Sequence, residues 1–235
     1  MKDSIFCREL PLIGEEGFSR LSRSHVIIFG IGGVGGYILE GLVRAGIGAI
    51  TVVDNDTVSE TNLNRQLLAT AETLGMQKTE AAMIRAKSIN PHIGFTCINT
   101  FYLPETADGI DLSEYDYIVD ATDTLAAKLE LAKRAEAENI PFISCMGTAN
   151  KLDPTGFCVT DIYKTEGCPL ARAMRSASRK LGLAPFKVVY SPQKSESAVV
   201  SFENGRHVPA SISYVPPIAG FIAAGEVIRA LAGIN

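Results

Sequence analysis

The sequence predicts a single α/β domain built on a doubly wound, mostly parallel β-sheet, with a C-terminal extension of strands and helices. The apolar run HVIIFG at 25–30 leads into a glycine cluster and then into helical spacing, and the run AITVVD follows at 49–54, the distance expected of a βαβ unit. Apolar runs and helical patterns alternate to about residue 150. With 235 residues, 46% of them hydrophobic, the chain can bury such a core. These features predict a Rossmann-like fold.

The period of the apolar residues predicts the individual elements. Strands are expected at 25–30, 49–54, 94–98, 115–121, 141–147, 152–162 and 186–191, and helices from residue 34 and at 77–90, 124–138, 168–183 and 215–234. The polar stretch 191–207 has no clear period, so we expect a mobile loop that can act as a lid. The run 215–234 opens with two prolines and contains Glu226 and Arg229, so we expect a buried interface helix and no membrane contact.

The cysteines and the N-terminal residues narrow the possible classes of protein. Five cysteines occur singly, without any CxxC pair, which argues against a zinc knuckle or a thioredoxin-type redox pair. The N-terminal residues do not resemble a secretory signal, so we expect a cytoplasmic protein with free thiols. Cys168, after Gly167 in a predicted loop, is the candidate for a reactive thiol.

A basic segment stands out in an acidic chain. The net charge is −4, but residues 164–194 hold seven Lys and Arg against one acid, which leaves −10 on the rest. Arg172, Arg175 and Arg179 recur at helical spacing, so they are expected to be free to contact the phosphates of a nucleic acid. The apolar face predicted for the same helix consists of Leu170, Met174, Ala177 and Leu181.

A glycine motif follows the first predicted strand. Gly30, Gly32, Gly33 and Gly35 lie between a strand and a helix, where missing side chains let phosphates approach backbone N–H groups at the positive end of the helix. The motif predicts a nucleotide site but does not separate NAD, FAD and ATP. Close helix–sheet packing is the alternative explanation.

Two acids follow the second strand. Asp54 ends the strand, where a carboxylate can accept both hydroxyls of a ribose, and Asp56 lies two residues further on. The alternative is that this segment merely builds a turn, since Asp and Asn are common turn residues.

A dense polar cluster comes next. Asn62, Asn64, Arg65 and Gln66 are expected to contact the nucleotide, with Arg65 gripping phosphate oxygens. Lys78 opens the following helix, where a cation gains nothing from the helix dipole, so a ligand anion explains it better than solvent does. We expect its side chain to be exposed in the site.

Asp120 and Asp123 end the fourth strand. Ligands of open α/β sheets bind at this carboxyl edge, and Asp123 is the candidate for holding Mg²⁺ on a triphosphate. We expect Asp123 to be exposed; its alternative role is an N-cap of the helix at 124–138.

Taken in order, the segments GIGGVGG, TVVDNDTV, NLNRQ, GMQKTEA, INPH and DATD resemble the ubiquitin-activating-type adenylating enzymes, which include ThiF, MoeB and HesA proteins. The resemblance implies that Asp54 holds the ribose of ATP, Arg65 and Lys78 the triphosphate, and Asp123 Mg²⁺. It also implies a homodimer in which Arg8 reaches the partner's site. Arg8, Arg65, Lys78 and Asp123 are therefore the candidate catalytic residues.

The second half of the chain narrows the resemblance. The stretch at 146–165, then CPLARAMR and VVYSPQ, is similar to the tRNA threonylcarbamoyladenosine dehydratases. That likeness implies ATP-dependent cyclisation of a tRNA nucleoside through an acyl adenylate, with residues 1–150 binding ATP and 151–235 serving substrate binding and dimerisation. A cysteine desulfurase or sulfur-acceptor partner is compatible with it. The alternatives are activation of a ubiquitin-like sulfur carrier, a nicotinamide oxidoreductase and a silent tRNA-binding scaffold.

Overall fold

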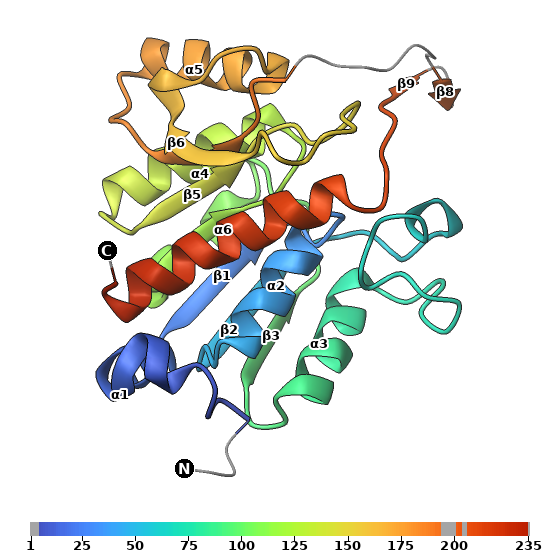
Figure 1. Ribbon diagram of the computed structural model, residues 1–235. Coiled ribbons are helices and arrows are strands. Elements are labelled where there is room, and N and C mark those ends of the chain that lie inside the picture. Colours follow the sequence, from blue (N-terminus) through green and yellow to red (C-terminus); the bar gives the residue numbers. More distant parts are fainter. Residues whose placement is uncertain (1–4, 194–200, 204–205, 235) are drawn as a thin grey trace.

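The computed structural model describes residues 5–193, 201–203 and 206–234, and its centre is a seven-stranded sheet in the order β3-β2-β1-β4-β5-β7-β6 (Figure 1). All neighbouring strands are parallel except β6, which runs antiparallel to β7. The strands are β1 (His25–Phe29), β2 (Ala49–Val53), β3 (Gly94–Ile98), β4 (Tyr117–Asp120), β5 (Phe142–Cys145), β6 (Cys158–Asp161) and β7 (Lys187–Tyr190). The predicted α/β class and all seven predicted strands are confirmed.

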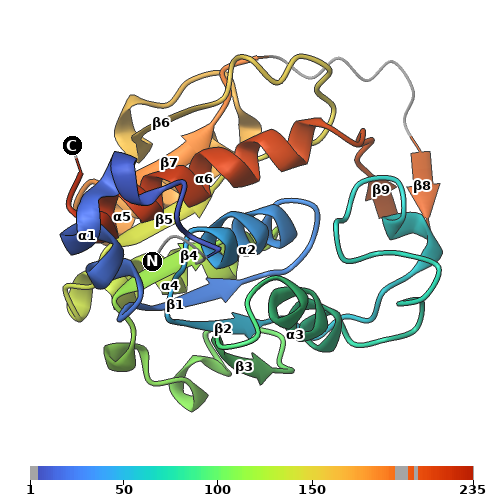
Figure 2. The same cartoon turned by 60° about the horizontal axis from the view of Figure 1, so that its bottom comes forward.

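Helices cover both faces of this sheet (Figures 1 and 2). One face carries α2 (Gly35–Arg44), α3 (Lys78–Ile89), α6 (Val215–Ala232) and the N-terminal α1 (Leu10–Leu21); the other carries α4 (Leu125–Ala137) and α5 (Pro169–Leu181). Short 3-10 turns lie at Glu60–Asn62, Ala107–Gly109, Leu112–Glu114 and Ile162–Lys164. The chain is thus a three-layer domain with a core on each side of the sheet.

The central strands are apolar on both faces because both are covered. Val26 and Ile28 of β1 pack into the core below α2 and α6, while Ile27 and Phe29 pack into the core below α4, and all four are fully buried. A strand buried in this way reads in the sequence as an uninterrupted apolar run instead of an alternating one.

Helix α6 packs along α2 and also contacts α1 and the sheet, which confirms the prediction of a buried helix. Glycines allow the close approach: a Cβ on Gly41 would lie 2.7 Å from Cβ of Ala224, and one on Gly220 would lie 2.6 Å from the carbonyl oxygen of Val34. By length and composition α6 is a candidate membrane span, but half of it is buried within the domain. Ile218 and Phe221 remain partly exposed on its outer side.

Helix α1 and one short β-hairpin have no counterpart among the predicted helices and strands. Helix α1 contains Pro11 and a kink at Gly14 (φ 73°), which obscure its helical pattern. A short hairpin of β8 (Ser201–Glu203) and β9 (Arg206–Val208) overlaps the stretch 191–207 that we expected to be a loop. Residues 194–200 and 204–205 of that stretch lie outside the described residues, so its action as a lid stays a prediction.

Candidate active site

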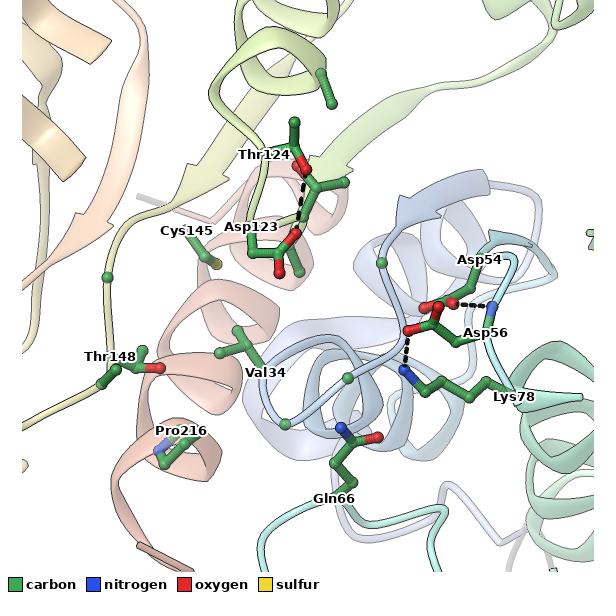
Figure 3. A pocket seen from close by; sticks show the side chains of 18 of the residues that line it. Val34, Asp54, Asp56, Gln66, Lys78, Asp123, Thr124, Cys145, Thr148 and Pro216 are labelled. Atoms are coloured by element: carbon green, nitrogen blue, oxygen red, sulfur yellow. Dashed lines mark hydrogen bonds and ion pairs between the residues drawn. The ribbon is translucent and has the colours of Figure 1, made fainter. Parts of the chain in front are cut away.

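A cavity of about 680 Å³ opens at the carboxyl ends of the central strands. It lies where the strand order reverses between β1 and β4, which is the usual ligand site of a doubly wound sheet. Its walls are the glycine loop after β1, the loops after β2, β3, β4 and β5, and the segment that leads into α6 (Figure 3). A cavity of this size suits a small molecule such as a nucleotide.

The four glycines of the motif fall into two groups. Gly30 has φ +84°, and a Cβ there would lie 2.8 Å from the carbonyl oxygen of Ala121; a Cβ on Gly35 would lie only 1.8 Å from the carbonyl oxygen of Gly30. These two glycines are required by the fold itself. At Gly32 the nearest atom to a Cβ would be the Gln66 amide nitrogen, 3.8 Å away, so this position is open toward the cavity. Gly33 also lines the cavity, while Gly35 does not.

Asp54 joins the second strand to the glycine loop. Its Oδ2 accepts the N–H of Ile31 at 2.7 Å, and its Oδ1 accepts the N–H of Asp56 at 2.9 Å. The carboxylate lines the cavity and is half-buried, and each oxygen retains a second lone pair. Asp54 therefore shapes the loop and keeps acceptor capacity for ribose hydroxyls.

Lys78 lies in the wall as one half of an ion pair. Its Nζ is 2.6 Å from Oδ2 of Asp56, and its side chain is 7% exposed whereas that of Asp56 is 59% exposed (Figure 3). The expectation that Lys78 is exposed is thus wrong, because the loop after β2 folds over the start of α3 and its Asp56 carbonyl also accepts the N–H of Lys78 at 3.0 Å. Asp56 does more than build a turn: it holds a buried cation at the cavity.

The polar cluster after β2 contributes three side chains to the cavity wall, those of Asn62, Arg65 and Gln66. Arg65 donates from one terminal nitrogen to Thr61 O (2.9 Å) and to Oδ1 of Asn64 (2.8 Å). Asn64 does not line the cavity. Instead its Nδ2 donates to the carbonyl oxygen of a C-terminal residue, Ser211, at 3.2 Å. It thereby ties this loop to the segment that leads into α6.

Asp123 is an exposed carboxylate on the cavity wall, as expected. The N-cap of α4 is Thr124, whose hydroxyl donates to Oδ1 of Asp123 at 3.2 Å, so Asp123 does not cap this helix. Within the described part of the chain no group of three His, Cys, Asp or Glu side chains could hold a metal ion. A metal ion held by Asp123 would need further ligands from a bound nucleotide and from water.

Two parts of the site were not predicted from the sequence. One is the opposite wall, formed by residues after β5 and by C-terminal residues; it includes Met146, Gly147, Thr148, Ala149, Leu170, Pro209, Ser211 and Pro216. Cys145 also faces the cavity, and burial raises the pKa of its thiol to about 12 (Figure 3). The other part is Lys128, a fully buried lysine beneath the cavity floor that forms an ion pair with Asp120. The sequence signals were the position of Met146 at the end of a predicted strand and of Leu170 on a predicted apolar face; no such signal marked Lys128, Pro209 or Ser211.

Arg8 lies far from the cavity of its own chain. Phe6, two residues earlier, packs on Phe18 and against Gly46, in the turn that precedes β2. That turn is at the amino ends of the strands, whereas the cavity is at their carboxyl ends. Arg8 is exposed and does not line the cavity.

The three arginines of α5 are not equivalent. Arg172 and Arg179 are exposed, and the guanidinium of Arg179 lies 5.4 Å from the ring centre of Tyr163. Arg175 is partly buried and donates to the carbonyl oxygen (2.6 Å) and hydroxyl (2.5 Å) of Thr165, so the expectation that it is free is wrong. The predicted apolar face is only partly right: Met174 is buried and Leu170 packs against the core, but the other buried residues are Ala171 and Ser178, and Leu181 is 57% exposed.

Cys168 is not an exposed loop thiol. It is the N-cap residue of α5 and is buried in the core beside α4, with 3% of its surface exposed. A Cβ on Gly147 would lie 3.7 Å from its sulfur. Its burial argues against the reactive role expected from the sequence.

Comparison with known proteins places this geometry in context. Residues 6–235 match the ThiF family. The chain is 38% identical to the tRNA threonylcarbamoyladenosine dehydratase of Bacillus subtilis (strain 168), over 96% of this chain and 94% of that protein. It is 31% identical to the molybdopterin-synthase adenylyltransferase of Escherichia coli (strain K12), over 93% of this chain and 77% of that protein.

Solved structures share the fold. Crystal structures of the E. coli tRNA N6-threonylcarbamoyladenosine dehydratase TcdA in complex with AMP and with ATP superpose with TM-scores of 0.87 and 0.86, at 30% identity and over 97% of this chain. The matched regions make up 94% and 93% of the chains in those two structures.

Proposed function

The chain belongs to the ThiF family, and we propose that it catalyses the ATP-dependent cyclisation of threonylcarbamoyladenosine in tRNA through an acyl-adenylate intermediate. The observation that carries this proposal is the near full-length similarity to the B. subtilis relative of that name. The TcdA structures in complex with ATP and AMP support ATP as the co-substrate. The cavity supports the same co-substrate, because one wall carries an unobstructed glycine, a carboxylate suited to ribose hydroxyls and two cationic side chains.

We assign the nucleotide to the wall formed by the first two strands. The ribose hydroxyls would donate to Asp54, which already lies against the glycine loop. The phosphates would lie over Gly32, where no side chain intrudes, between Arg65 and Lys78. Arg65 has guanidinium N–H groups left for phosphate oxygens, and Lys78 is held at the cavity by Asp56.

The reaction on this site has two steps. An oxygen of the threonyl carboxylate attacks the α-phosphorus of ATP, and the bond to the pyrophosphate oxygen breaks. The ureido group of the same nucleoside then attacks the activated carbonyl carbon, releases a proton, and displaces AMP as the ring closes. The net change is loss of water from the nucleoside, driven by cleavage of ATP to AMP and pyrophosphate. The protein contributes positioning and neutralisation of the phosphate charge.

Asp123 fits a Mg²⁺ ion that arrives with the nucleotide. Mg²⁺ is commonly held by one or two carboxylates together with substrate phosphates and water, and an exposed carboxylate on the cavity wall meets that requirement. The ion would neutralise charge on the departing pyrophosphate. We therefore keep Mg²⁺ as a proposed cofactor and Asp123 as its ligand.

Steady-state AMP release with tRNA that carries threonylcarbamoyladenosine tests this function. We expect Lys78→Met and Asp123→Ala to lower kcat/KM by about 10²-fold or more. The first removes a cation that faces the phosphates, and the second removes the proposed ligand of the Mg²⁺ ion. Exposed residues supply the matched controls, Lys87→Met on the same helix as Lys78 and Asp108→Ala away from the cavity. The cyclic nucleoside should appear on mass spectrometry of the digested tRNA, in step with AMP. Release of AMP without it, or unchanged kinetics in both site variants, contradicts the proposal.

A second candidate function is adenylation of the C-terminus of a ubiquitin-like sulfur carrier, because the chain is also similar to the molybdopterin-synthase adenylyltransferase. The sequence lacks the CxxC pairs of a structural zinc site, and the Cys168 thiol is buried, which favours the tRNA substrate. Pyrophosphate exchange separates the two: stimulation by a protein ending in Gly-Gly, but not by the tRNA, supports the carrier. A nicotinamide oxidoreductase leaves Arg65, Lys78 and Asp123 without a role.

We further propose a homodimer in which Arg8 completes the partner's site. Arg8 lies at the amino edge of the sheet, so its own cavity is out of its reach. The exposed Ile218 and Phe221 on α6 supply apolar surface for an interface. In this arrangement residues 1–150 bind ATP and residues 151–235 serve the substrate and the dimer.

For tRNA we propose the exposed basic face of α5, now reduced to Arg172 and Arg179 and their basic neighbour Lys180. Their charges can contact phosphates without base specificity. A cysteine desulfurase or sulfur-acceptor partner follows from the family resemblance, and a cytoplasmic location stays the expectation drawn from the sequence.

A further inference from the structure

A closed polar network lies beneath the cavity floor. Lys128, on the second turn of α4, donates from Nζ to Oδ2 of Asp120 (2.9 Å), to the carbonyl oxygen of Cys145 (2.7 Å) and to the hydroxyl of Ser144 (3.4 Å). The hydroxyl of Ser144 donates to Oδ2 of Asp120 at 2.5 Å. Oδ1 of Asp120 accepts both the N–H (3.0 Å) and the hydroxyl (2.7 Å) of Thr122. We call these five residues the Lys128 network.

Stability alone does not explain a charge pair at this depth. The side chains of Lys128 and Asp120 are both 0% exposed. Desolvation of two charges commonly offsets their attraction, and well-packed apolar residues often serve stability equally well. What the network supplies is a defined geometry, since the three donors of Lys128 each have an acceptor and both oxygens of Asp120 are bonded.

The network ends in two of the cavity loops. Thr122 belongs to the loop after β4, and the next residue is Asp123, the proposed Mg²⁺ ligand. Cys145 ends β5, and the residues that follow it, Met146 to Ala149, form the opposite wall. Lys128 therefore joins the loop that would face the phosphates to the loop that would face the second substrate, although it does not itself line the cavity.

We propose that Lys128 is a positioning residue: through Asp120 and the Cys145 carbonyl it sets the relative position of the loops 121–124 and 145–149, and so the place of Asp123. The inference rests on the proposed function for the identity of the ligands. Its structural core is the link from Lys128 to Thr122, which holds for any nucleotide and metal ion bound in this cavity.

The test combines a charge-free variant with a readout that does not need turnover. The double variant Asp120→Asn/Lys128→Met removes both charges together, so neither is left buried without a partner. In the wild type Mg²⁺ should tighten ATP binding, measured by calorimetry with and without the ion. We call the factor by which Mg²⁺ tightens ATP binding the Mg²⁺ gain. In the double variant we expect the Mg²⁺ gain to fall about 10-fold, while metal-free ATP binding changes less than about 3-fold. We expect kcat to fall about 10²-fold. Adding Asp123→Ala should then cause little further loss of the Mg²⁺ gain.

Two further variants keep the test decisive. Thr122→Val removes only the hydroxyl link between the network and the Asp123 loop, without a change of charge, and should lower the Mg²⁺ gain about 3-fold. Lys133→Met, on the exposed side of the same helix, should behave as wild type. A folded double variant with the Mg²⁺ gain and kcat of the wild type overturns the inference. If the double variant does not fold, a Thr122→Val protein with the wild-type Mg²⁺ gain overturns it instead. If the wild type binds Mg²⁺ and ATP but releases no AMP with the modified tRNA, the proposed function fails while the positioning role can still be judged from binding.

Discussion

The glycine motif can be divided experimentally into residues that the fold needs and a residue that the ligand needs. In Gly35→Ala the new Cβ would be placed 1.8 Å from the carbonyl oxygen of Gly30, whereas real Cβ atoms essentially never come within 3.0 Å of another atom. Both groups are backbone, so the start of α2 or the loop must move by more than 1 Å. We expect a loss of about 3 kcal/mol or more in the free energy of unfolding. For a chain of this size, that loss lowers the Tm by about 6 to 12 °C.

Gly32→Ala is the matched variant in the same loop. Its Cβ would meet nothing closer than the Gln66 amide at 3.8 Å, so we expect the Tm to stay within about 2 °C of the wild type. The added methyl group would occupy space assigned to phosphate, so ATP binding should weaken about 10-fold or more. Differential scanning calorimetry and ATP titration of both variants make the comparison. The reasoning is refuted if Gly35→Ala keeps its Tm, or if Gly32→Ala binds ATP as the wild type does.

Three further predictions concern the Cys145 thiol, the basic face of α5 and the homodimer. The pKa of Cys145 is raised from 9.0 to about 12, so its contribution to stability is complete below pH 9 and is lost toward pH 12. Between pH 9 and pH 12 the free energy of unfolding should thus fall more steeply in the wild type than in Cys145→Ala, by up to about 1.4 kcal/mol per pH unit. If the two proteins give parallel plots of unfolding free energy against pH, the raised pKa of Cys145 is contradicted. Replacing Arg172 and Arg179 by Ala should reduce the slope of log K for tRNA binding against log salt concentration by up to about 2 units and leave ATP binding unchanged. An unchanged slope means that this face of α5 does not bind tRNA. Mixing inactive Arg8→Ala and Lys78→Met proteins should restore part of the AMP release, because mixed dimers keep one intact site, and no recovery despite subunit exchange rules out action across the interface.

The central strands were predictable because they are almost continuously apolar. A strand covered on both faces, such as β1, carries a local signal that does not depend on its neighbours. The positions of Asp54 and Asp123 followed from the same signal, since residues just after parallel strands meet at one edge of the sheet. Helix α1 and the β8–β9 hairpin were missed because their patterns are broken or too short.

Roles that depend on burial were not readable in this way. Lys78, Lys128 and Arg175 each lie in a predicted helix, and nothing in the local sequence shows that their side chains are buried. The structure buries the first against Asp56 and the second against Asp120, and it turns the third toward Thr165. A rotation of α5 by part of a turn from the predicted face decides whether an arginine is exposed or buried, and local spacing does not determine that angle.

The sequence by itself determined the α/β class, the nucleotide edge of the sheet and the resemblance to the adenylating enzymes, because these are carried by short segments whose residues act together locally. The tertiary structure decided which strand lies beside β1, which glycines the backbone requires, and how Lys128 joins two loops. It also brought Pro209, Ser211 and Pro216 to the cavity from more than 80 residues beyond Asp123. These outcomes depend on contacts between segments far apart in the chain, and no local pattern of residues specifies such contacts.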